Sequence, residues 1–267
     1  MLYFWRKRMK YEMVELTYEE NFATITLNCP EKRNALSLKL MKELTAAFNE
    51  VGESNYMGIF LAARGPVFSA GHDFNDMAGK DLAHMRKLLK VCTTLMETIQ
   101  SVPQPVLARV HALATAAGCQ LVASCDLAVA AEEAGFATPG GKGGWFCFTP
   151  MVAVSRSISR KRAAEMLFTG DVIDAKTAAE WGLINRCVPT ANLLEESHKL
   201  LTAATRGSFF SKAVGKQAFY AQIDLDQPKA YAYALEVMAS TSQTPDAQER
   251  MKAFLEKRKP ELNRPGK

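Results

Sequence analysis

The sequence predicts an α/β fold that is followed by a purely helical segment. Stretches typical of strands and of helices alternate along the first 190 residues, and only helical patterns follow Pro189. With 267 residues, the chain can bury a large core without disulfides or metals. We therefore expect an α/β body over residues 12–190. A helical region over residues 191–267 then either closes the core or builds an interface between subunits.

Each element of the body follows from its own pattern. Alternating residues around a polar turn predict strands at 14–18 and 22–27. Apolar residues at a 3.6-residue period predict a helix over 38–51, with Ser37 as its N-cap, and another over 81–101. Short apolar runs predict buried strands at 58–62, 67–68, 106–110 and 127–131. Four helices are expected in the helical region, at 192–205, 209–221, 227–240 and 245–257.

The composition argues against several classes of function. The net charge of +5 is mild and no nucleic-acid-binding signature accompanies it, so nucleic-acid binding is not expected. The basic clusters at 6–8 and 257–259 are either solvated surface or contacts for a phosphate. The apolar part of the N-terminus is too short for a membrane span. A transit peptide is an alternative, because no acidic residue precedes Glu12.

The six cysteines favour a reducing compartment over a metal site. They form no Cys-x-x-Cys pair and no histidine cluster accompanies them, so no metal is expected. Several lie in apolar surroundings, which is typical of buried, reduced thiols. We expect a cytoplasmic protein, or a protein of the mitochondrial matrix if the source is eukaryotic.

Two loops of small residues are the candidate site. Residues 68–73 follow a predicted strand, and Gly71 lets the backbone approach a ligand closely. Residues 110–120 run from a strand into a helix through side chains of almost no size. Close helix packing is one explanation. The other is an oxyanion hole, in which one backbone N–H from each loop binds the same carbonyl oxygen.

The two loops and four further motifs resemble the enoyl-CoA hydratase/isomerase (crotonase) superfamily. The further motifs are Pro-Glu-Lys-Arg-Asn-Ala-Leu at 30–36, Cys-Asp-Leu-Ala at 125–128, Leu-Phe-Thr-Gly at 167–170 and Ala-Phe-Leu-Glu-Lys-Arg-Lys-Pro at 253–260. The resemblance covers nearly the whole chain. It implies a crotonase-type spiral of ββα repeats, with C-terminal helices that form a homotrimer, often within a dimer of trimers.

The resemblance also implies a site for an acyl-CoA thioester. The thioester oxygen would lie between the N–H groups of His72 and Ala117. The pantetheine would pass the loop around Lys32 and Arg33, with the adenine near Ala70 and His72. The remaining expected substrate and CoA contacts are Asp73, Ala116, Gly118, Pro139, Trp145, Phe146 and Lys257. No separate cofactor is expected, because coenzyme A is part of the substrate.

The sequence departs from the family where the hydratases carry two glutamates. Gln120 stands at the first position and Gly140 at the second, where Thr138-Pro139-Gly140 replaces Gln-Pro-Glu. Hydration needs a base for water and an acid for the α-carbon, and each such group is worth about 10²–10⁴-fold in rate. Gln120 can hold a water molecule but cannot accept its proton at neutral pH. Efficient hydration, and isomerisation by a single carboxylate, are therefore disfavoured.

Several side chains are alternatives to the missing carboxylates. His72 either transfers protons or faces the adenine region. Asp73 either caps the next turn or orients His72, and Asp76 lies either at the surface or in the pocket. Cys119 is either a packed thiol or a thiol activated at a helix N-terminus.

Cys147 and His111 could each serve a structural or a chemical role. Cys147 is either a nucleophile or, with Trp145, Phe146 and Phe148, part of an apolar pocket wall. His111 is expected to be structural.

Two functions remain open on the sequence alone. An enzyme would stabilise an enolate-like intermediate in the oxyanion hole, with Gln120 or His72 positioning water or substrate. Decarboxylation suits such a site better than hydration, because the breaking bond supplies the electrons without a base. Weak hydratase or isomerase activity, and hydrolysis through Cys119 or His72, are lesser options. The alternative is a non-catalytic acyl-CoA-binding or scaffold protein.

Overall fold

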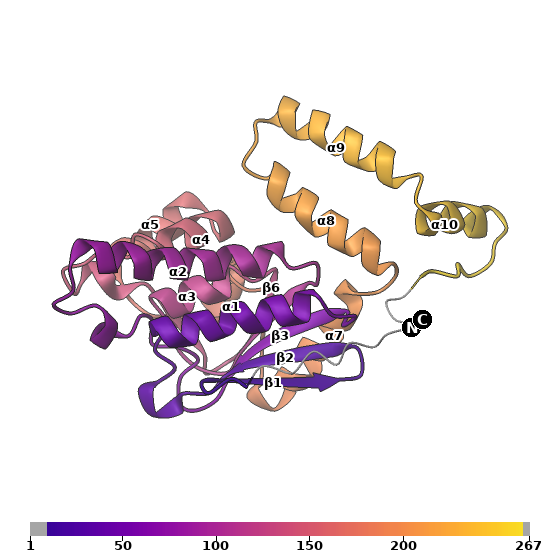
Figure 1. The fold of residues 1–267 in the computed structure, drawn as a ribbon. Helices are drawn as coiled ribbons and strands as arrows, with labels where there is room; N and C mark the ends of the chain where they lie inside the picture. The colour runs from indigo at the N-terminus through magenta and orange to yellow at the C-terminus, as the bar shows by residue number, and fades with distance from the viewer. Residues whose placement is uncertain (1–9, 264–267) are drawn as a thin grey trace.

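The computed structural model describes residues 10–263 as a layered body and a projecting helical arm (Figure 1). The basic cluster at 6–8 lies outside the described residues. No helix in the described part combines the length and hydropathy needed to cross a membrane. Within the same residues, no group of three or more His, Cys, Asp and Glu side chains is placed to hold a metal ion.

A six-stranded sheet forms the centre of the body. Its order is β1 (Val14–Glu19), β2 (Phe22–Leu27), β3 (Gly58–Ala63), β4 (Val106–Val110), β6 (Leu127–Ala131) and β9 (Arg186–Val188). β1 pairs with β2 in antiparallel fashion, and the other neighbours are parallel. Parallel pairing requires a crossover between strands, and the helices of the body supply these crossovers.

A second, smaller sheet lies beside the first. It consists of β5 (Ala114–Thr115), β7 (Gly135–Ala137) and β8 (Ile173–Asp174), in that order. β5 is the short strand that leads directly into the helix α3 (Ala117–Ala123). The small sheet thus holds the middle of the predicted loop at 110–120.

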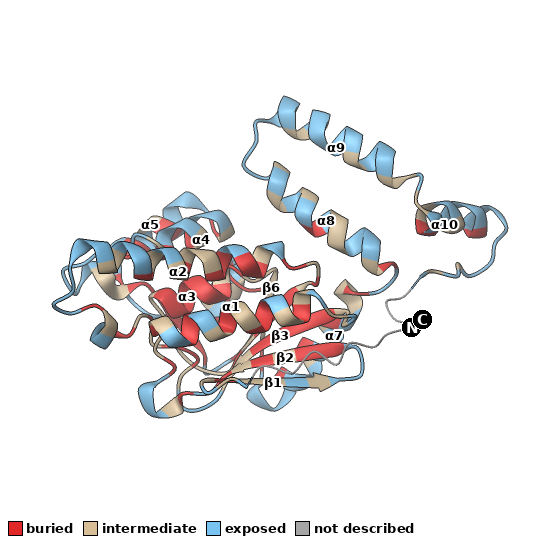
Figure 2. Ribbon diagram, in the orientation of Figure 1, coloured by how far each residue is buried: buried red, intermediate tan, exposed pale blue. Residues whose placement is uncertain are grey.

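Helices cover both faces of the large sheet (Figure 2). α1 (Leu38–Gly52), α2 (Leu82–Ser101) and α3 pack on the face that carries Ile59 and Leu61. α7 (Leu193–Ala204) packs on the opposite face, against Phe60 and its neighbours. Successive strand residues point to opposite faces, so the inner strands β3 and β6 are buried on both sides and their sequences are continuously apolar. The remaining helices of the body are α4 (Pro150–Ser157), α5 (Arg160–Thr169) and α6 (Ala175–Trp181).

Polar caps fix the ends of the first helices. The Ser37 hydroxyl accepts a hydrogen bond from the Leu40 amide at 3.2 Å, which confirms Ser37 as the N-cap of α1. Asp76 adds a second acceptor at the same end, since its carboxylate accepts from the Leu38 amide at 2.7 Å. Asp81 caps α2 in the same way.

The predicted elements are confirmed with one exception. The structure contains the predicted strands at the start of the chain, the buried strands β3, β4 and β6, and the helices α1, α2 and α7. The strand predicted at 67–68 is wrong. Phe68 is buried, but its amide donates to the Leu113 carbonyl in a loop, and only an isolated bridge follows between Ser69 and Ala114.

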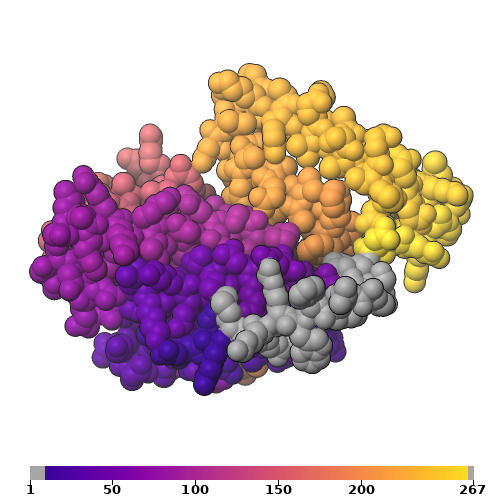
Figure 3. Space-filling model, viewed as in Figure 1, coloured from indigo at the N-terminus to yellow at the C-terminus, as the bar shows by residue number. Residues whose placement is uncertain are grey.

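Three helices extend away from the body as an arm. They are α8 (Phe209–Gln222), α9 (Gln227–Thr241) and α10 (Pro245–Leu255), which match three of the four helices expected after residue 191. The fourth, α7, packs on the sheet instead of extending with them. Figure 3 shows the arm standing off from the body in orange and yellow. Large apolar side chains of the arm are exposed, including Met238 at 77%, Phe254 at 70% and Leu255 at 79%.

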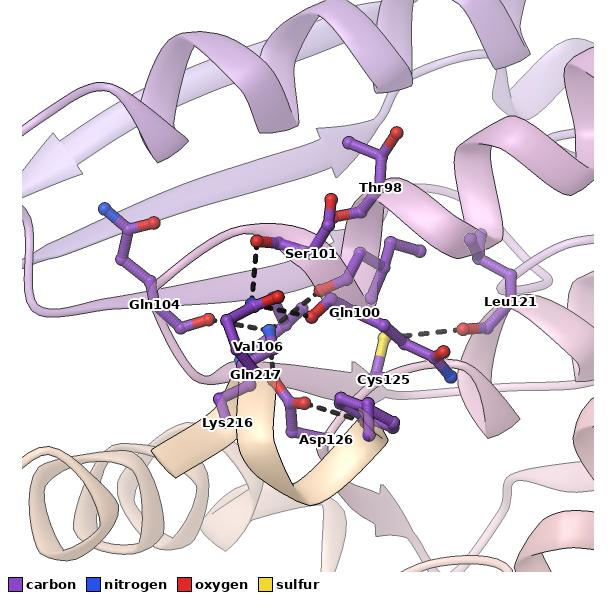
Figure 4. A network of polar contacts seen from close by, with 12 residues as sticks. Thr98, Gln100, Ser101, Gln104, Val106, Leu121, Cys125, Asp126, Lys216 and Gln217 are labelled. Atoms are coloured by element: carbon purple, nitrogen blue, oxygen red, sulfur yellow. Dashed lines mark hydrogen bonds and ion pairs between the residues drawn. The ribbon is translucent and has the colours of Figure 1, made fainter. Parts of the chain in front are cut away.

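A buried polar network attaches the arm to the body (Figure 4). Lys216 of α8 donates to the carbonyl oxygens of Ile99 and Gln104 at 2.8 and 2.9 Å. The Asp126 carboxylate accepts from the Val106 amide at 2.6 Å and from the Tyr220 hydroxyl at 2.8 Å. Because Asp126 follows α3, the network links the arm to the helix that begins at the candidate site.

Candidate functional site

Three chain segments meet at the site and are held together by backbone hydrogen bonds. The Leu36 amide donates to the Gly71 carbonyl at 2.7 Å, which joins the motif at 30–36 to the loop at 68–73. The Thr115 amide donates to the Ser69 carbonyl at 3.0 Å, which joins that loop to the segment before α3. The two predicted loops are therefore direct neighbours.

Glycine is required where the two loops touch. A Cβ atom on Gly118 would lie 2.5 Å from the Ser69 carbonyl oxygen, a distance that real Cβ atoms do not show. Ser69 cannot withdraw easily, because its hydroxyl donates to the Asn34 carbonyl at 2.8 Å. Asn34 in turn donates from its side-chain amide to the Arg64 carbonyl at 2.8 Å. Gly118 thus permits the close packing of α3 on the first loop.

The amides of His72 and Ala117 are both unpaired in this arrangement. Neither N–H donates to another group within residues 10–263. The two lie in adjoining segments, because a Cβ atom on Gly71 would be 3.3 Å from the Ala117 nitrogen. Gly71 has a φ of +88°, so the close approach and the backbone conformation both demand glycine there.

The carbonyl groups of the same two peptides fix how these amides are aimed. The Gly71 carbonyl accepts from Leu36, and the Ala116 carbonyl accepts from the Gln120 amide at 3.1 Å. A trans peptide places its N–H opposite its C=O. Each N–H is therefore held on the side away from its bonded carbonyl. This leaves two fixed donors of the kind that an oxyanion hole requires.

Gln120 is buried, and its side-chain amide cannot act as a base at neutral pH. It is 5% exposed, and its Oε1 atom lies 3.9 Å from the Cys92 sulfur. Among the described residues, no hydrogen bond or ion pair brings a carboxylate to Gln120 or to His72.

Gly140 has no room for a longer side chain. A Cβ atom there would lie 2.3 Å from the Trp145 carbonyl oxygen and 2.8 Å from the Cys147 sulfur. The loop is closed on itself, because the Trp145 amide donates to the Gly140 carbonyl at 2.9 Å and the Gly140 amide donates to the Cys147 sulfur at 3.3 Å. The loop thus occupies the volume that a Cβ atom at position 140 would need.

The His72 imidazole is largely buried. Burial lowers the pKa of His72, and the nearby Leu36 backbone only partly opposes this. Neither ring nitrogen has a hydrogen-bond partner of good geometry among the described residues. A neutral imidazole can accept a proton or a hydrogen bond from a ligand.

The two aspartates after His72 serve backbone groups. The Asp73 carboxylate accepts from the Asn75 amide at 2.9 Å, which confirms that it caps the turn Phe74–Asp76. The Asp76 carboxylate is used at the start of α1, as described above. His111 has the structural contact expected of it, since its Nε2 lies 2.7 Å from the Gly65 carbonyl oxygen.

The cysteines near the site are not activated. Burial raises the pKa of Cys119 to about 12, because the thiolate would be removed from water. This contradicts the alternative of a thiol activated at the start of α3. Burial also raises the pKa of Cys147, although the Gly140 amide opposes the shift. Both thiols are packed in the core of the body.

The residues expected to bind coenzyme A occupy several places. Lys32 and Arg33 are exposed at the end of the turn Pro30–Lys32, and Ala70 is half-buried beside the loop contact. Lys257 is exposed two residues after α10, and Figure 1 shows α10 far from α3 within the same chain. Pro139 begins the turn that contains Gly140.

Aromatic side chains surround that turn. Phe146 is half-buried and contacts the rings of Phe148 and Phe168, each with a centroid distance of 5.5 Å. Trp145 and Phe148 are exposed. Phe146, Phe148 and Phe168 of α5 thus form an aromatic cluster, and the pocket wall expected from the sequence stays a prediction.

Sequence reasoning missed a cavity of about 580 Å³ that Gln120 borders. Gln120 lines it, together with residues of α2, α4 and α8. An ion pair between Arg156 of α4 and Asp224, just after α8, lies at this cavity with a distance of 3.1 Å. Its walls come from α2, α3, α4 and α8 and from the segments 124–128 and 182–185, so no local pattern in the sequence could reveal it.

Comparison with known proteins gives a consistent result. The model of the enoyl-CoA hydratase/isomerase family matches residues 17–265. The chain is 43% identical over 249 residues to the mitochondrial enoyl-CoA hydratase domain-containing protein 3 of Xenopus laevis, which covers 92% of this chain and 84% of that protein. The human protein of the same name is 42% identical over 245 residues, with 90% and 80% covered.

Solved structures agree with this relationship. An enoyl-CoA hydratase from Mycobacterium smegmatis superimposes with a TM-score of 0.90 at 43% identity, covering 94% of this chain and 98% of that one. The human enoyl-CoA hydratase domain-containing protein 3 gives the same TM-score at 40% identity, with 94% and 100% covered. Together with the family match, these comparisons show that the chain belongs to the enoyl-CoA hydratase/isomerase family and has the crotonase fold.

Proposed function

We propose that this chain binds an acyl-CoA thioester with the thioester oxygen between the amides of His72 and Ala117. The observation that carries the proposal is the pair of unpaired N–H groups in adjoining segments, each held by its own bonded carbonyl. Buried donors without partners are costly in a folded protein, and a ligand oxygen would satisfy both. Removing one such donor typically reduces a rate by about 10²–10³-fold.

The proposed reaction proceeds through an enolate that these amides stabilise. Decarboxylation of a carboxyacyl-CoA suits the site best. The carbon–carbon bond to the carboxylate breaks, carbon dioxide leaves, and the electron pair passes into the thioester enolate. A proton from solvent then completes the α-carbon. Hydration would instead need a base and an acid, and the positions of Gln120 and Gly140 provide neither.

His72 and Gln120 are assigned supporting roles. A neutral His72 can relay a proton or hold a water molecule near the enolate. Gln120 can orient water or substrate through hydrogen bonds. Weak hydratase or isomerase activity is a lesser outcome of the same site.

A non-catalytic acyl-CoA-binding or scaffold role is the second candidate. The closed loop around Gly140 favours it, because the space for an acid–base group is occupied by the protein itself. Binding by the two amides would be retained, and only the chemistry would be lost.

The proposal also covers the assembly of the protein with copies of itself and its location in the cell. The exposed apolar residues of α8–α10 support assembly into a homotrimer or a dimer of trimers. Lys257 would then meet the coenzyme A phosphates of a ligand bound to another subunit, because it follows α10, which lies far from α3 of its own chain. A mitochondrial location is proposed from the names of the relatives.

The test is to incubate the pure protein with crotonyl-, malonyl- and methylmalonyl-CoA and to measure both turnover and binding. Loss of carbon dioxide from a carboxyacyl-CoA, with little hydration of crotonyl-CoA, is the expected result. Binding without turnover of any ester would reject the enzyme and favour the scaffold. Absence of binding to every ester would reject the proposed site.

A further inference from the structure

Ala116 adopts a backbone conformation that alanine rarely takes. Its φ is +51° and its ψ is −120°, and it lies immediately before the Ala117 amide. A non-glycine residue in such a conformation persists only where its surroundings hold it. Two contacts do so here: the Ala116 amide donates to the Ala137 carbonyl at 2.8 Å, and the Ala116 carbonyl accepts from Gln120.

The methyl group of Ala116 lies at the contact between the two amide-bearing segments. A Cβ atom on Gly71 would approach the Ala116 Cβ to 2.8 Å. The methyl group therefore faces the α-carbon of Gly71, directly before His72. Atoms at a packed contact of this kind set how closely two segments approach.

We propose that the Ala116 methyl group is a spacer that sets the separation of the His72 and Ala117 amides. Through that separation it sets how strongly a thioester carbonyl is polarised. This inference rests on the proposed function, and it makes Ala116 a positioning residue that does not itself touch the substrate oxygen.

The two peptide planes explain why one methyl group has this effect. The peptide that carries the His72 amide is anchored by Leu36 on its carbonyl side. The peptide that carries the Ala117 amide is anchored by Gln120 in the same way. Each of these hydrogen bonds is made by the carbonyl group, on the opposite side of the peptide from the N–H group. On the side where the segments face each other, the Ala116 methyl group lies 2.8 Å from the position that a Cβ atom on Gly71 would take.

Ala116→Gly isolates the role of the methyl group. Glycine adopts positive φ at low cost, so the variant should fold and its hydrogen bonds can form. The loops would lose their spacer and the Ala117 peptide would rotate more freely. Ala123→Gly is the matched control, because it removes a methyl group from the other end of the same helix.

The experiment compares butyryl-CoA with its thioether analogue, S-butyl-CoA, which lacks the carbonyl oxygen. The wild-type protein should bind the thioester more tightly and lower its carbonyl stretching frequency. In Ala116→Gly we expect the thioester-to-thioether affinity ratio to fall at least about five-fold and the frequency shift to shrink. The thioether affinity should not change, and Ala123→Gly should behave like the wild type.

The experiment distinguishes a failure of the spacer inference from a failure of the proposed function. If Ala116→Gly keeps the wild-type affinity ratio and frequency shift, the spacer role is overturned while the proposed site stands. If the wild-type protein binds both compounds equally and shifts no carbonyl frequency, the proposed function itself is overturned.

Discussion

The Nζ atom of Lys216 lies 2.7 Å from the Oδ2 atom of Asp126, and this ion pair is the buried link between the arm and the body. The two side chains are only 6% and 16% exposed. Burial lowers the pKa of Lys216, and the Asp126 carboxylate opposes that shift. Removing one partner of a buried pair leaves the other charge without compensation, at a typical cost of about 3–5 kcal/mol.

Lys216→Met should therefore lower the free energy of unfolding by about 3 kcal/mol, near the bottom of that range. The lower value applies because Asp126 keeps its bonds to Val106 and Tyr220. Urea unfolding measures the loss, and small-angle X-ray scattering should show a more extended arm. Lys229→Met is the control, since its ion pair with Asp226 is exposed and should be worth less than about 1 kcal/mol. Equal losses in the two variants would contradict the account.

His72 should make the protein less stable in mild acid. Burial lowers its pKa in the folded state, so the unfolded chain binds a proton that the folded chain resists. The stabilisation is fully present above the unfolded pKa of about 6.5 and is lost as the pH falls through the lower folded pKa. Urea unfolding between pH 5 and 8 should show this slope, and His72→Gln should reduce it. An imidazole that is already charged at pH 7 by NMR would refute the prediction.

Glutamates introduced at positions 120 and 140 should not make the protein an efficient hydratase. Gln120→Glu changes no volume, but Gly140→Glu places its Cβ 2.3 Å from the Trp145 carbonyl oxygen. The loop must move, and overpacking of this kind typically costs about 1–3 kcal/mol. Crotonyl-CoA hydration by the double variant should therefore stay far below the gain of about 10²–10⁴-fold per group. A rise of several orders of magnitude, with unchanged thermal stability, would show that the loop accommodates the side chain.

Cys119 should resist alkylation in the folded protein. The thiolate is the reactive form, and burial raises the pKa of this thiol to about 12. Iodoacetamide at pH 8, followed by mass spectrometry, should label the half-buried Cys187 before Cys119. Labelling in urea should reach both. Preferential modification of Cys119 in the native protein would revive its role as a nucleophile.

The fold was largely predictable because most of its elements carry a local pattern. The 3.6-residue period of α1 and α2 and the apolar runs of β3 and β4 are visible over a few neighbouring residues. Strands of two or three residues, such as β5 and β7, are too short to show a period. The strand predicted at 67–68 failed because burial alone does not distinguish a strand from a buried loop.

The site was predictable in its loops but not in its details. Small residues before Gly118 indicated a close approach, and the contact with Ser69 accounts for it. The lack of space at Gly140 depends on how close the Trp145 carbonyl oxygen lies to it, and no sequence motif indicates that distance. The contact of Lys216 with Asp126 joins residues 90 positions apart, so only the tertiary structure brings them together.

The most direct test of the account follows the two amide protons themselves. Protein labelled with ¹⁵N at alanine and histidine is titrated with butyryl-CoA and then with S-butyl-CoA, and ¹H–¹⁵N spectra are recorded. We predict that the amide protons of His72 and Ala117 shift downfield with the thioester and much less with the thioether, because only the thioester has a carbonyl oxygen next to its sulfur to accept from them. If both compounds bind and these two resonances respond alike to each, the thioester oxygen is not held by these amides.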